Sequence, residues 1–251
     1  MSRTKAPRAD LFTRSAEAEK VPSRRVRWNA TYRLISSRYP PIELFERIAP
    51  QSDWQALHLL EALTDPRLRD AVGNISLVPT SKRINGPNAS VVMAPFTHCS
   101  TSKPTRFSDG TYGIYYARRT FVTALLEVSF HMARFHRATI DPPMTDQYRT
   151  YKGSIDKIMN DIRGGGYEDL LQPDPRDYGK SQAFAATLRN AGSNGIVYPS
   201  VRHNGGQCIA AFWPNVVSLP MQSQHITLKW NGRSISEWFD GDTETWQPMP
   251  G

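Results

Sequence analysis

One segment of the chain carries apolar residues at helical spacing and gives the clearest pattern in the sequence. Between residues 120 and 136, the apolar side chains are separated by four, three, four and three positions. They are Phe121, Leu125, Val128, Met132 and Phe135. This spacing places all five on one face of an α-helix. The sequence therefore predicts a helix over 120–136 whose apolar face lies in the core.

Shorter apolar segments bounded by turn-forming residues predict strands. The predicted strands cover residues 28–36, 75–78, 91–96, 111–117, 195–199, 207–213, 216–219 and 226–230. Further helices are predicted over residues 42–48, 53–63, 155–162 and 181–191. The last of these ends at Gly192, a typical residue after a helix C-terminus. Strands mixed with separated helices, without a repeated βαβ pattern, are typical of an α+β fold.

The positive charge of the chain is concentrated at its beginning. The 251 residues carry a net charge of +8. Residues 1–27 contain eight Lys or Arg and three Asp or Glu, so +5 of this charge lies there and +3 in the rest. We expect a basic flexible tail over 1–27, a main domain over 28–230 with an insertion near 139–179, and a C-terminal tail over 231–251. Because a basic tail can bind nucleic acid without sequence preference, a nucleic-acid-binding module remains an alternative.

Cysteine and histidine positions exclude several kinds of site. The two cysteines, Cys99 and Cys208, form no CxxC pair, which argues against a zinc ribbon or a disulfide scaffold. His131 and His136 are five positions apart and there is no HExxH motif, so no metal site and no cofactor are expected. Cys208 is expected to be a buried, unreactive thiol. Without a signal-peptide core or an apolar run of ~18–20 residues, a cytoplasmic protein is expected.

Glu127 is the strongest single candidate for chemistry. It is the only charged residue between Arg119 and Arg134, and its neighbours are mostly apolar. A carboxylate on such a helix loses hydration and must find a partner. Groups in this position often have perturbed pKa values and mark functional sites. The alternatives are a structural ion pair or a solvent-facing position on the helix.

Four further residues are candidates, although each also has a purely structural interpretation. Arg33, in the first predicted strand, could bind a phosphate with its planar fork, or lie at a sheet edge. Arg106 lies in a loop that could bind an anion or simply be solvated. The ring of Tyr116 could stack on a flat heterocycle or belong to the core. Ser200 follows a buried strand without a G-x-S-x-G motif, so it is not expected to be a hydrolase nucleophile, and it could equally be a turn residue.

Taken in order, the segments around these residues resemble one known family. They are TYRLIS with Arg33, RFSDGTYGIYYA with Arg106 and Tyr116, TALLEVSFH with Glu127 and AGSNGIVYPSVR with Ser200. The chain resembles, over about residues 28–219, the RES-domain family, which is named for an arginine, a glutamate and a serine. The loop of Arg106 departs from the pattern, because the family usually reads close to G-R-W-N there.

The resemblance implies a fold and an activity. The fold would be similar to that of ADP-ribosylating toxins, with a split β core surrounded by helices. The protein would cleave NAD⁺ between nicotinamide and ribose, by hydrolysis or phosphorolysis. NAD⁺ would then be the substrate rather than a cofactor, and inorganic phosphate a candidate co-substrate. Some members instead transfer ADP-ribose to a protein, an alternative for which the insertion near 139–179 could supply the docking surface.

The resemblance also implies a partner and a set of residue roles. The partner would be a small helix-turn-helix (Xre-like) antitoxin, with no membrane partner and with nucleic acid bound only through the antitoxin. The expected catalytic residues are Glu127, Arg33 and Ser200. The expected substrate-binding residues are Arg106, Tyr116, Tyr32 and Arg202. Glu127 would stabilise the positive charge that develops on the ribose. A non-catalytic family member is a further alternative, against which the presence of the site residues argues.

Overall fold

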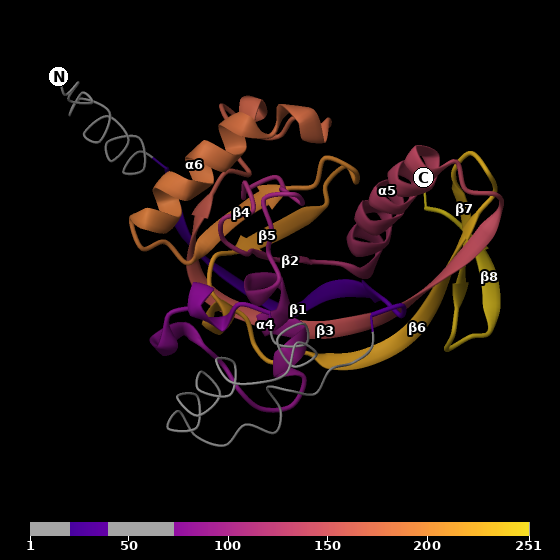
Figure 1. The fold of residues 1–251 in the computed structure, drawn as a ribbon, viewed down its shortest axis with the longest axis horizontal. Helices are drawn as coiled ribbons and strands as arrows, with labels where there is room; N and C mark the ends of the chain where they lie inside the picture. Colours follow the sequence, from indigo (N-terminus) through magenta and orange to yellow (C-terminus); the bar gives the residue numbers. More distant parts are fainter. Residues whose placement is uncertain (1–20, 40–72, 251) are drawn as a thin grey trace, which may run out of the picture.

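The computed structural model describes residues 21–39 and 73–250, which form one mixed sheet with three α-helices (Figure 1). The predicted α+β class is confirmed. The helices predicted over 42–48 and 53–63 lie outside the described residues.

The sheet contains eight strands in the order β1-β2-β5-β4-β3-β6-β7-β8. Their bounds are β1 Ser23–Ser36, β2 Tyr115–Arg118, β3 Met144–Asp161, β4 Gly195–Pro199, β5 Gln207–Ala211, β6 Met221–Trp230, β7 Ile235–Asp240 and β8 Thr245–Pro248. Because β1 also pairs with β3, the strands β1, β2, β5, β4 and β3 close into a ring. One edge of β3 pairs with β6 near its start and with β4 at its end. The sheet therefore divides along β3, as expected for a split β core.

The ring encloses a core to which all five of its strands contribute. The buried strand residues of this core are Val26, Trp28, Tyr115, Ala117, Ile155, Met159, Val197, Ile209 and Ala211. Helix α4 (Ala89–Thr97) adds Val92, Met93 and Phe96 to the same cluster. Alternate residues of a strand point to opposite faces. The neighbours Tyr116, Cys208 and Ala210 therefore face a second cluster, together with helix α6 (Gly179–Asn190).

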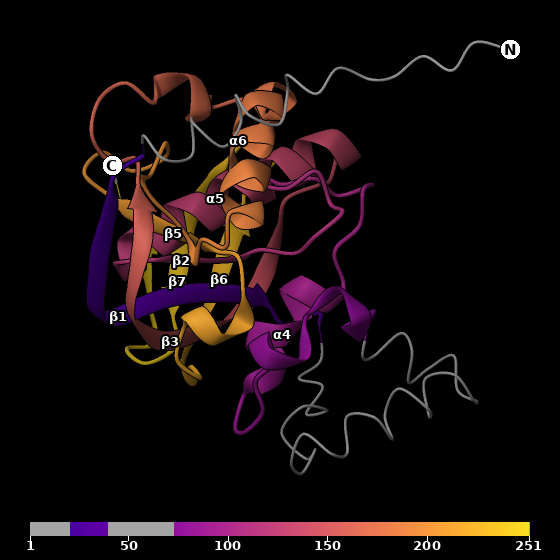
Figure 2. The same ribbon diagram turned by 90° about the vertical axis from the view of Figure 1, so that its left-hand side faces the viewer.

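Two helices lie on the opposite side of the molecule from α4. In Figures 1 and 2, α6 lies toward the top and α4 toward the bottom, and in Figure 1 α5 (Phe121–Thr139) lies between the β4–β5 pair and β7. Thr120 caps α5, because its side chain accepts a hydrogen bond from the backbone N–H of Thr123. Helix α5 packs on β1, β6 and β7 through Ala124 and Leu125.

The predicted helix over 120–136 is confirmed, but its buried face differs from the prediction. Phe135 is 45% exposed, whereas His136 is 1% exposed. The buried residues of the helix include Ala124, Ser129 and Ala133, whose small side chains let the helix approach the sheet closely. Spacing alone favoured the large residues, whereas polar partners in the sheet bury His136 instead.

The helix predicted over 155–162 is wrong, because these residues continue β3. Pairing with β1 along one edge and with β6 and β4 along the other overrides the local pattern. Much of the expected insertion near 139–179 is thus the longest strand of the sheet. Sequence reasoning could not detect this, because the pairing partners are distant in the chain.

Three predicted strands are also wrong. Residues 75–78 contain a 3₁₀ turn, η1 (Ile75–Leu77), and residues 91–96 belong to α4. Residues 216–219 begin with the last residue of another 3₁₀ turn, η5 (Pro214–Val216), and among them only Val217 forms a β-bridge, an isolated one with Ile155. A short buried apolar run has the same pattern in a helix and in a strand. The predicted strands at 195–199 and 207–213 and the helix at 181–191 are found as β4, β5 and α6.

The sheet reaches further toward both ends of the chain than expected. Strand β1 begins at Ser23 rather than 28, and Arg25 and Arg27 pair with Asp156 of β3 at 2.6 and 3.2 Å. Strands β7 and β8 form within the expected C-terminal tail. Of the segments beyond the expected bounds, β7 packs against α5.

Candidate active site

A fixed hydrogen bond joins Glu127 of α5 to Ser200, which follows β4. The Glu127 side chain is nearly buried, at 7% exposed. The Ser200 hydroxyl donates to Glu127 Oε1 at 2.6 Å and accepts from the backbone N–H groups of Arg202 and His203, both at 3.1 Å. A serine hydroxyl has one donor and two acceptor positions, so all of them are filled. Ser200 therefore holds Glu127 in place, and a bond from Ser200 to a substrate would require one of these three to break.

The loop that carries Ser200 is attached to the first turn of α5. His203 Nδ1 lies 2.8 Å from the Thr123 hydroxyl. Gly206 passes so close that a Cβ there would lie 2.8 Å from His203 Nδ1 and 2.9 Å from the Thr123 side chain. Because Glu127 lies one turn further along the same helix, this attachment sets the position of Ser200 relative to Glu127.

Two residues beside Glu127 come from the strands beneath it. Cys208 Sγ lies 4.0 Å from Glu127 Oε1, and the thiol is fully buried. Burial raises the pKa of Cys208 to about 12, which keeps it protonated and supports the expectation of an unreactive thiol. Arg118, the last residue of β2, is in register with Cys208 and with Tyr32. Burial lowers the pKa of Arg118, but the nearby Glu127 carboxylate and other ionisable groups raise it above its ordinary value.

Sequence reasoning missed Arg118. The residue ends the same YYAR strand that supplied Tyr116, and two positions along a strand bring a side chain back to the same face. This alternation was the signal that could have found it.

Arg106 lies in the second cluster and is held by the segment that leads to α6. Its Nη1 donates to the carbonyls of Leu170 at 3.3 Å and Gln172 at 2.8 Å. Its Nη2 donates to the Tyr178 hydroxyl at 3.2 Å, and its guanidinium carbon lies 4.4 Å from the centre of the Tyr178 ring. The predicted anion-binding fork thus contacts backbone carbonyls and a tyrosine in this structure.

Arg202 contacts the same segment from the other side. It donates to the carbonyl of Pro173, and its guanidinium carbon lies 3.3 Å from the centre of the Phe130 ring. Burial lowers the pKa of Arg202, whereas Tyr178 and the Glu127 carboxylate raise it, so the residue lies within electrostatic reach of both. Arg202 therefore links the surroundings of Glu127 to those of Arg106.

Tyr116 fixes the loop of Arg106. Its hydroxyl accepts from the backbone N–H of Phe107 at 3.1 Å and donates to the Thr105 hydroxyl at 3.0 Å. Burial raises its pKa to about 12. The hydroxyl is thus committed to the protein, and the ring packs against the second cluster.

Arg33 approaches the site from the other face of β2. Its Nη1 donates to the Tyr116 carbonyl at 3.0 Å, and its guanidinium carbon lies 4.7 Å from the centre of the Tyr115 ring. Burial lowers its pKa. The adjacent Tyr32 points the opposite way, and the centres of its ring and of the Phe121 ring of α5 lie 6.3 Å apart. Within the described residues, no hydrogen bond or ion pair joins Arg33 to Glu127. The two predicted catalytic residues each lie beside β2 but are not joined to each other.

The arrangement as a whole combines one fixed carboxylate with two guanidinium groups within electrostatic reach of it, and two further arginines lie on neighbouring segments. Arg118 and Arg202 lie within electrostatic reach of Glu127, Arg106 is joined to Arg202 through Tyr178, and Arg33 bonds to β2. Such a site attracts an anionic ligand and offers one carboxylate for a positive charge that develops on it. Among residues 21–39 and 73–250, no group of three or more His, Cys, Asp or Glu is placed to hold a metal ion.

Comparison with known proteins gives the family. The RES domain matches residues 80–231, which include Glu127, Ser200, Arg106, Tyr116 and Arg202. The chain belongs to the RES domain family. Arg33 and Tyr32 precede the matched residues.

The RES-domain chain is also similar to two individual proteins. The uncharacterized protein y4oC of Sinorhizobium fredii (strain NBRC 101917 / NGR234) is 27% identical over 207 residues, which cover 82% of this chain and 84% of that protein. The crystal structure of the M. tuberculosis MbcT–MbcA toxin–antitoxin complex contains a chain with 10% identity and a TM-score of 0.42. That comparison covers 88% of this chain and 92% of the other. Within the described part of the protein, no helix is both long enough and apolar enough to cross a membrane.

Proposed function

We propose that this RES-domain protein cleaves NAD⁺ at the bond between nicotinamide and ribose, with water or phosphate as the acceptor. The observation that carries the proposal is the 2.6 Å hydrogen bond from Ser200 to the nearly buried Glu127. It joins two of the residues for which the family is named, in a site rich in arginine. We further propose that the protein is the toxin of a toxin–antitoxin pair, with a small helix-turn-helix antitoxin as its partner.

Glu127 would act on the ribose. Cleavage of the nicotinamide–ribose bond builds positive charge on the sugar, as in glycoside cleavage. A carboxylate fixed by Ser200 and shielded from water is suited to stabilise that charge, because it does not have to reorient during the reaction. A preorganised group of this kind contributes ~2.7–4 kcal/mol to lowering a barrier. The arginines would hold the diphosphate and so place the ribose near Glu127.

The structure weakens the support for the two other functions considered. The acceptor-docking surface expected for protein ADP-ribosylation was the segment 139–179, but residues 144–161 of it form β3. The basic segment expected to bind nucleic acid includes Arg25 and Arg27, which lie in β1 and pair with Asp156. A deletion that tests nucleic-acid binding must therefore stop before β1.

Replacement of Glu127 tests the proposed role of its carboxylate in NAD⁺ cleavage. Glu127→Gln keeps the size of the side chain but removes its charge, so the rate of nicotinamide release from NAD⁺ should fall at least about a hundredfold. Glu244→Gln is a matched control, since Glu244 is exposed in the turn between β7 and β8. The released nicotinamide should be measured by mass spectrometry. Both variants should unfold at the same temperature as the wild-type protein, so that a lower rate does not result from misfolding. A wild-type rate in Glu127→Gln would contradict the proposed role.

A further inference from the structure

Part of the connection between β3 and α6 contacts two arginines of the candidate site. We call this part, residues 167–178, the strap (Figure 1). It contains the 3₁₀ turns η3 (Glu168–Leu170) and η4 (Pro175–Asp177). Its sequence holds four Asp or Glu and one Arg, so its net charge is −3. The strap therefore brings negative charge to arginines that are expected to bind an anionic substrate.

Arg106 and Arg202 both donate hydrogen bonds to the strap. Their acceptors are the carbonyls of Leu170, Gln172 and Pro173 and the hydroxyl of Tyr178. Arg106 bonds to the carbonyl of Gln172 and Arg202 to that of the next residue, so the two guanidinium groups meet the strap at adjacent positions. A guanidinium binds a phosphate through the same N–H donors. The strap and a bound phosphate group therefore compete for them.

The contact between the strap and Arg202 lies beside the carboxylate of the site. The backbone N–H of Arg202 donates to the Ser200 hydroxyl, which in turn donates to Glu127. The Arg202 guanidinium carbon lies 3.3 Å from the centre of the Phe130 ring, three residues after Glu127 on α5. The strap thus takes a position that a ligand on Arg106 and Arg202 would need.

Glycines at both ends of the strap leave its backbone free to rotate. Residues 164–166 are glycines, and Gly179 follows the strap. A Cβ on Gly164, Gly166 or Gly179 would meet no atom within 4 Å, so packing does not require glycine there. Gly166 has a φ of +91°, a conformation that glycine adopts without strain. Between these ends, three partly buried side chains attach the strap to the second cluster. They are Tyr167, Leu170 and Leu171.

We propose that the strap is an autoinhibitory segment, which occupies Arg106 and Arg202 in the free protein and is displaced when a diphosphate binds. Hydrogen bonds between a guanidinium and a charged phosphate oxygen are stronger than those to a neutral carbonyl, so a diphosphate can replace the strap. The apparent affinity then depends on the fraction of protein in which the strap is open. That the diphosphate belongs to NAD⁺ rests on the proposed function, whereas displacement by inorganic pyrophosphate does not.

Hydrogen–deuterium exchange of the wild-type protein, with and without inorganic pyrophosphate, tests the displacement. Peptides that cover residues 167–178 should exchange faster when pyrophosphate is bound, because the strap loses its contacts with the arginines. Peptides from α4, on the opposite side of the molecule, should exchange at an unchanged rate. Slower exchange of the strap would show that it closes over the ligand, and unchanged exchange would show that the arginines do not release it. Either result would overturn the inference.

A second test weakens the attachment of the strap without changing either arginine. The double variant Leu170→Ala/Leu171→Ala removes apolar contacts with the second cluster but keeps the backbone carbonyls. Because more of the protein is then open, the Kd for pyrophosphate, measured by calorimetry, should fall about tenfold. Leu219→Ala, at an exposed leucine outside the strap, is the matched control and should leave the Kd within about twofold of wild type. An equal or higher Kd in the double variant would overturn the inference, as would a failure of both it and the wild-type protein to bind pyrophosphate.

The outcomes separate the strap from the proposed function. If pyrophosphate displaces the strap but the wild-type protein leaves NAD⁺ intact, the autoinhibitory role stands and the proposed function fails. If the protein cleaves NAD⁺ but pyrophosphate does not displace the strap, the proposed function stands and the autoinhibitory role fails.

Discussion

At the scale of single residues, the Ser200 hydroxyl shows how the site is positioned. It joins Glu127 to the backbone of the loop that follows β4, through one donated and two accepted hydrogen bonds. A serine with all three positions filled orients a neighbour and is not placed to attack a substrate. Its role would therefore be to keep the carboxylate in a fixed orientation.

Ser200→Ala should reduce catalysis without abolishing it. A hydrogen bond to a charged group is worth about 1.5–3 kcal/mol, which corresponds to a fall in kcat of about tenfold to a hundredfold. KM for NAD⁺ should change much less, since the arginines that bind the substrate remain. Steady-state kinetics of nicotinamide release measures both, with Ser223→Ala, an exposed serine of β6, as the control. A covalent adduct of NAD⁺ on Ser200, seen by mass, would show that Ser200 is a nucleophile and contradict this role.

The sequence predicted the pair Glu127 and Ser200 better than it predicted the arginines. An isolated carboxylate on an apolar helix can be recognised locally, because its burial follows from its neighbours. Arg118 and Arg106 could not be ranked in this way. The donors of Arg106 bond to carbonyls 64 and 66 residues further along the chain, whereas the Nε of Arg118 has no partner among the described residues. This difference depends on how the chain folds and cannot be read from the neighbouring residues.

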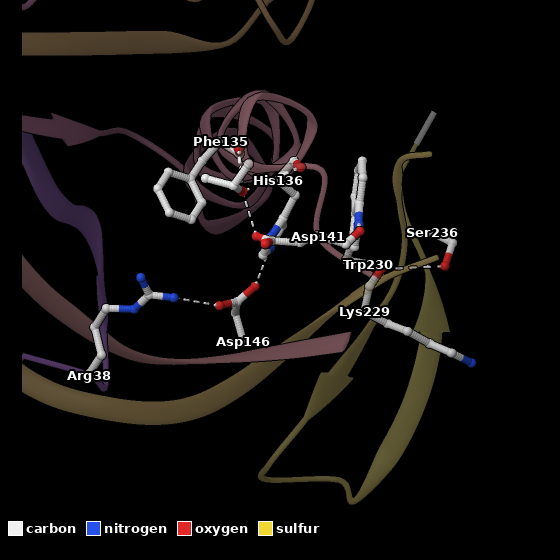
Figure 3. A network of polar contacts seen from close by, with 9 residues as sticks. Arg38, Phe135, His136, Asp141, Asp146, Lys229, Trp230 and Ser236 are labelled. Atoms are coloured by element: carbon white, nitrogen blue, oxygen red, sulfur yellow. Dashed lines mark hydrogen bonds and ion pairs between the residues drawn. The ribbon is translucent and has the colours of Figure 1, made fainter. Parts of the chain in front are cut away.

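At the scale of elements, a buried polar network fixes the C-terminal end of α5 to the sheet (Figure 3). His136 Nδ1 lies 2.8 Å from Asp141 Oδ2, and its Nε2 lies 2.6 Å from Asp146 Oδ2 in β3. Its ring is stacked on Trp230 of β6 at 5.2 Å. Arg38, after β1, donates to the other oxygen of Asp146 at 3.1 Å. The network connects three strands to the helix that carries Glu127.

His136→Ala should destabilise the fold strongly. It removes both carboxylate contacts and leaves Asp146, which is 5% exposed, with Arg38 as its one remaining side-chain partner among the described residues. Each hydrogen bond lost to a charged group costs about 1.5–3 kcal/mol. Urea unfolding at neutral pH measures the loss, with His225→Ala, an exposed position of β6, as the control. A loss below about 1 kcal/mol would show that the network does not hold α5 to the sheet.

Element predictions succeeded where a local pattern decides the structure and failed where distant pairing does. The helix α5 and the strands β4 and β5 follow from spacing and turn residues. Strand β3 does not, because its residues are ordered by three partner strands. The burial of His136 in place of Phe135 depends on Asp146 in the same strand. Spacing along α5 could not reveal it.

At the scale of the whole molecule, the ring of five strands and α5 bring together residues that are far apart in the chain. Glu127 lies on the helix, Ser200 and Cys208 come from the β4–β5 hairpin, and Arg118 and Arg33 flank the junction of β1 and β2. The order of these segments in the sequence predicted a common site. Only the closed ring shows that Arg33 and Glu127 approach it from different faces of the sheet.

The most direct test of the central claim is to incubate the purified protein with NAD⁺, with and without inorganic phosphate, and to resolve the products by mass. The account predicts loss of NAD⁺ and release of free nicotinamide. ADP-ribose would identify water as the acceptor, and a phosphate-dependent phosphorylated ADP-ribose would identify phosphate. Intact NAD⁺ under both conditions, with correctly folded protein, would contradict the proposed cleavage.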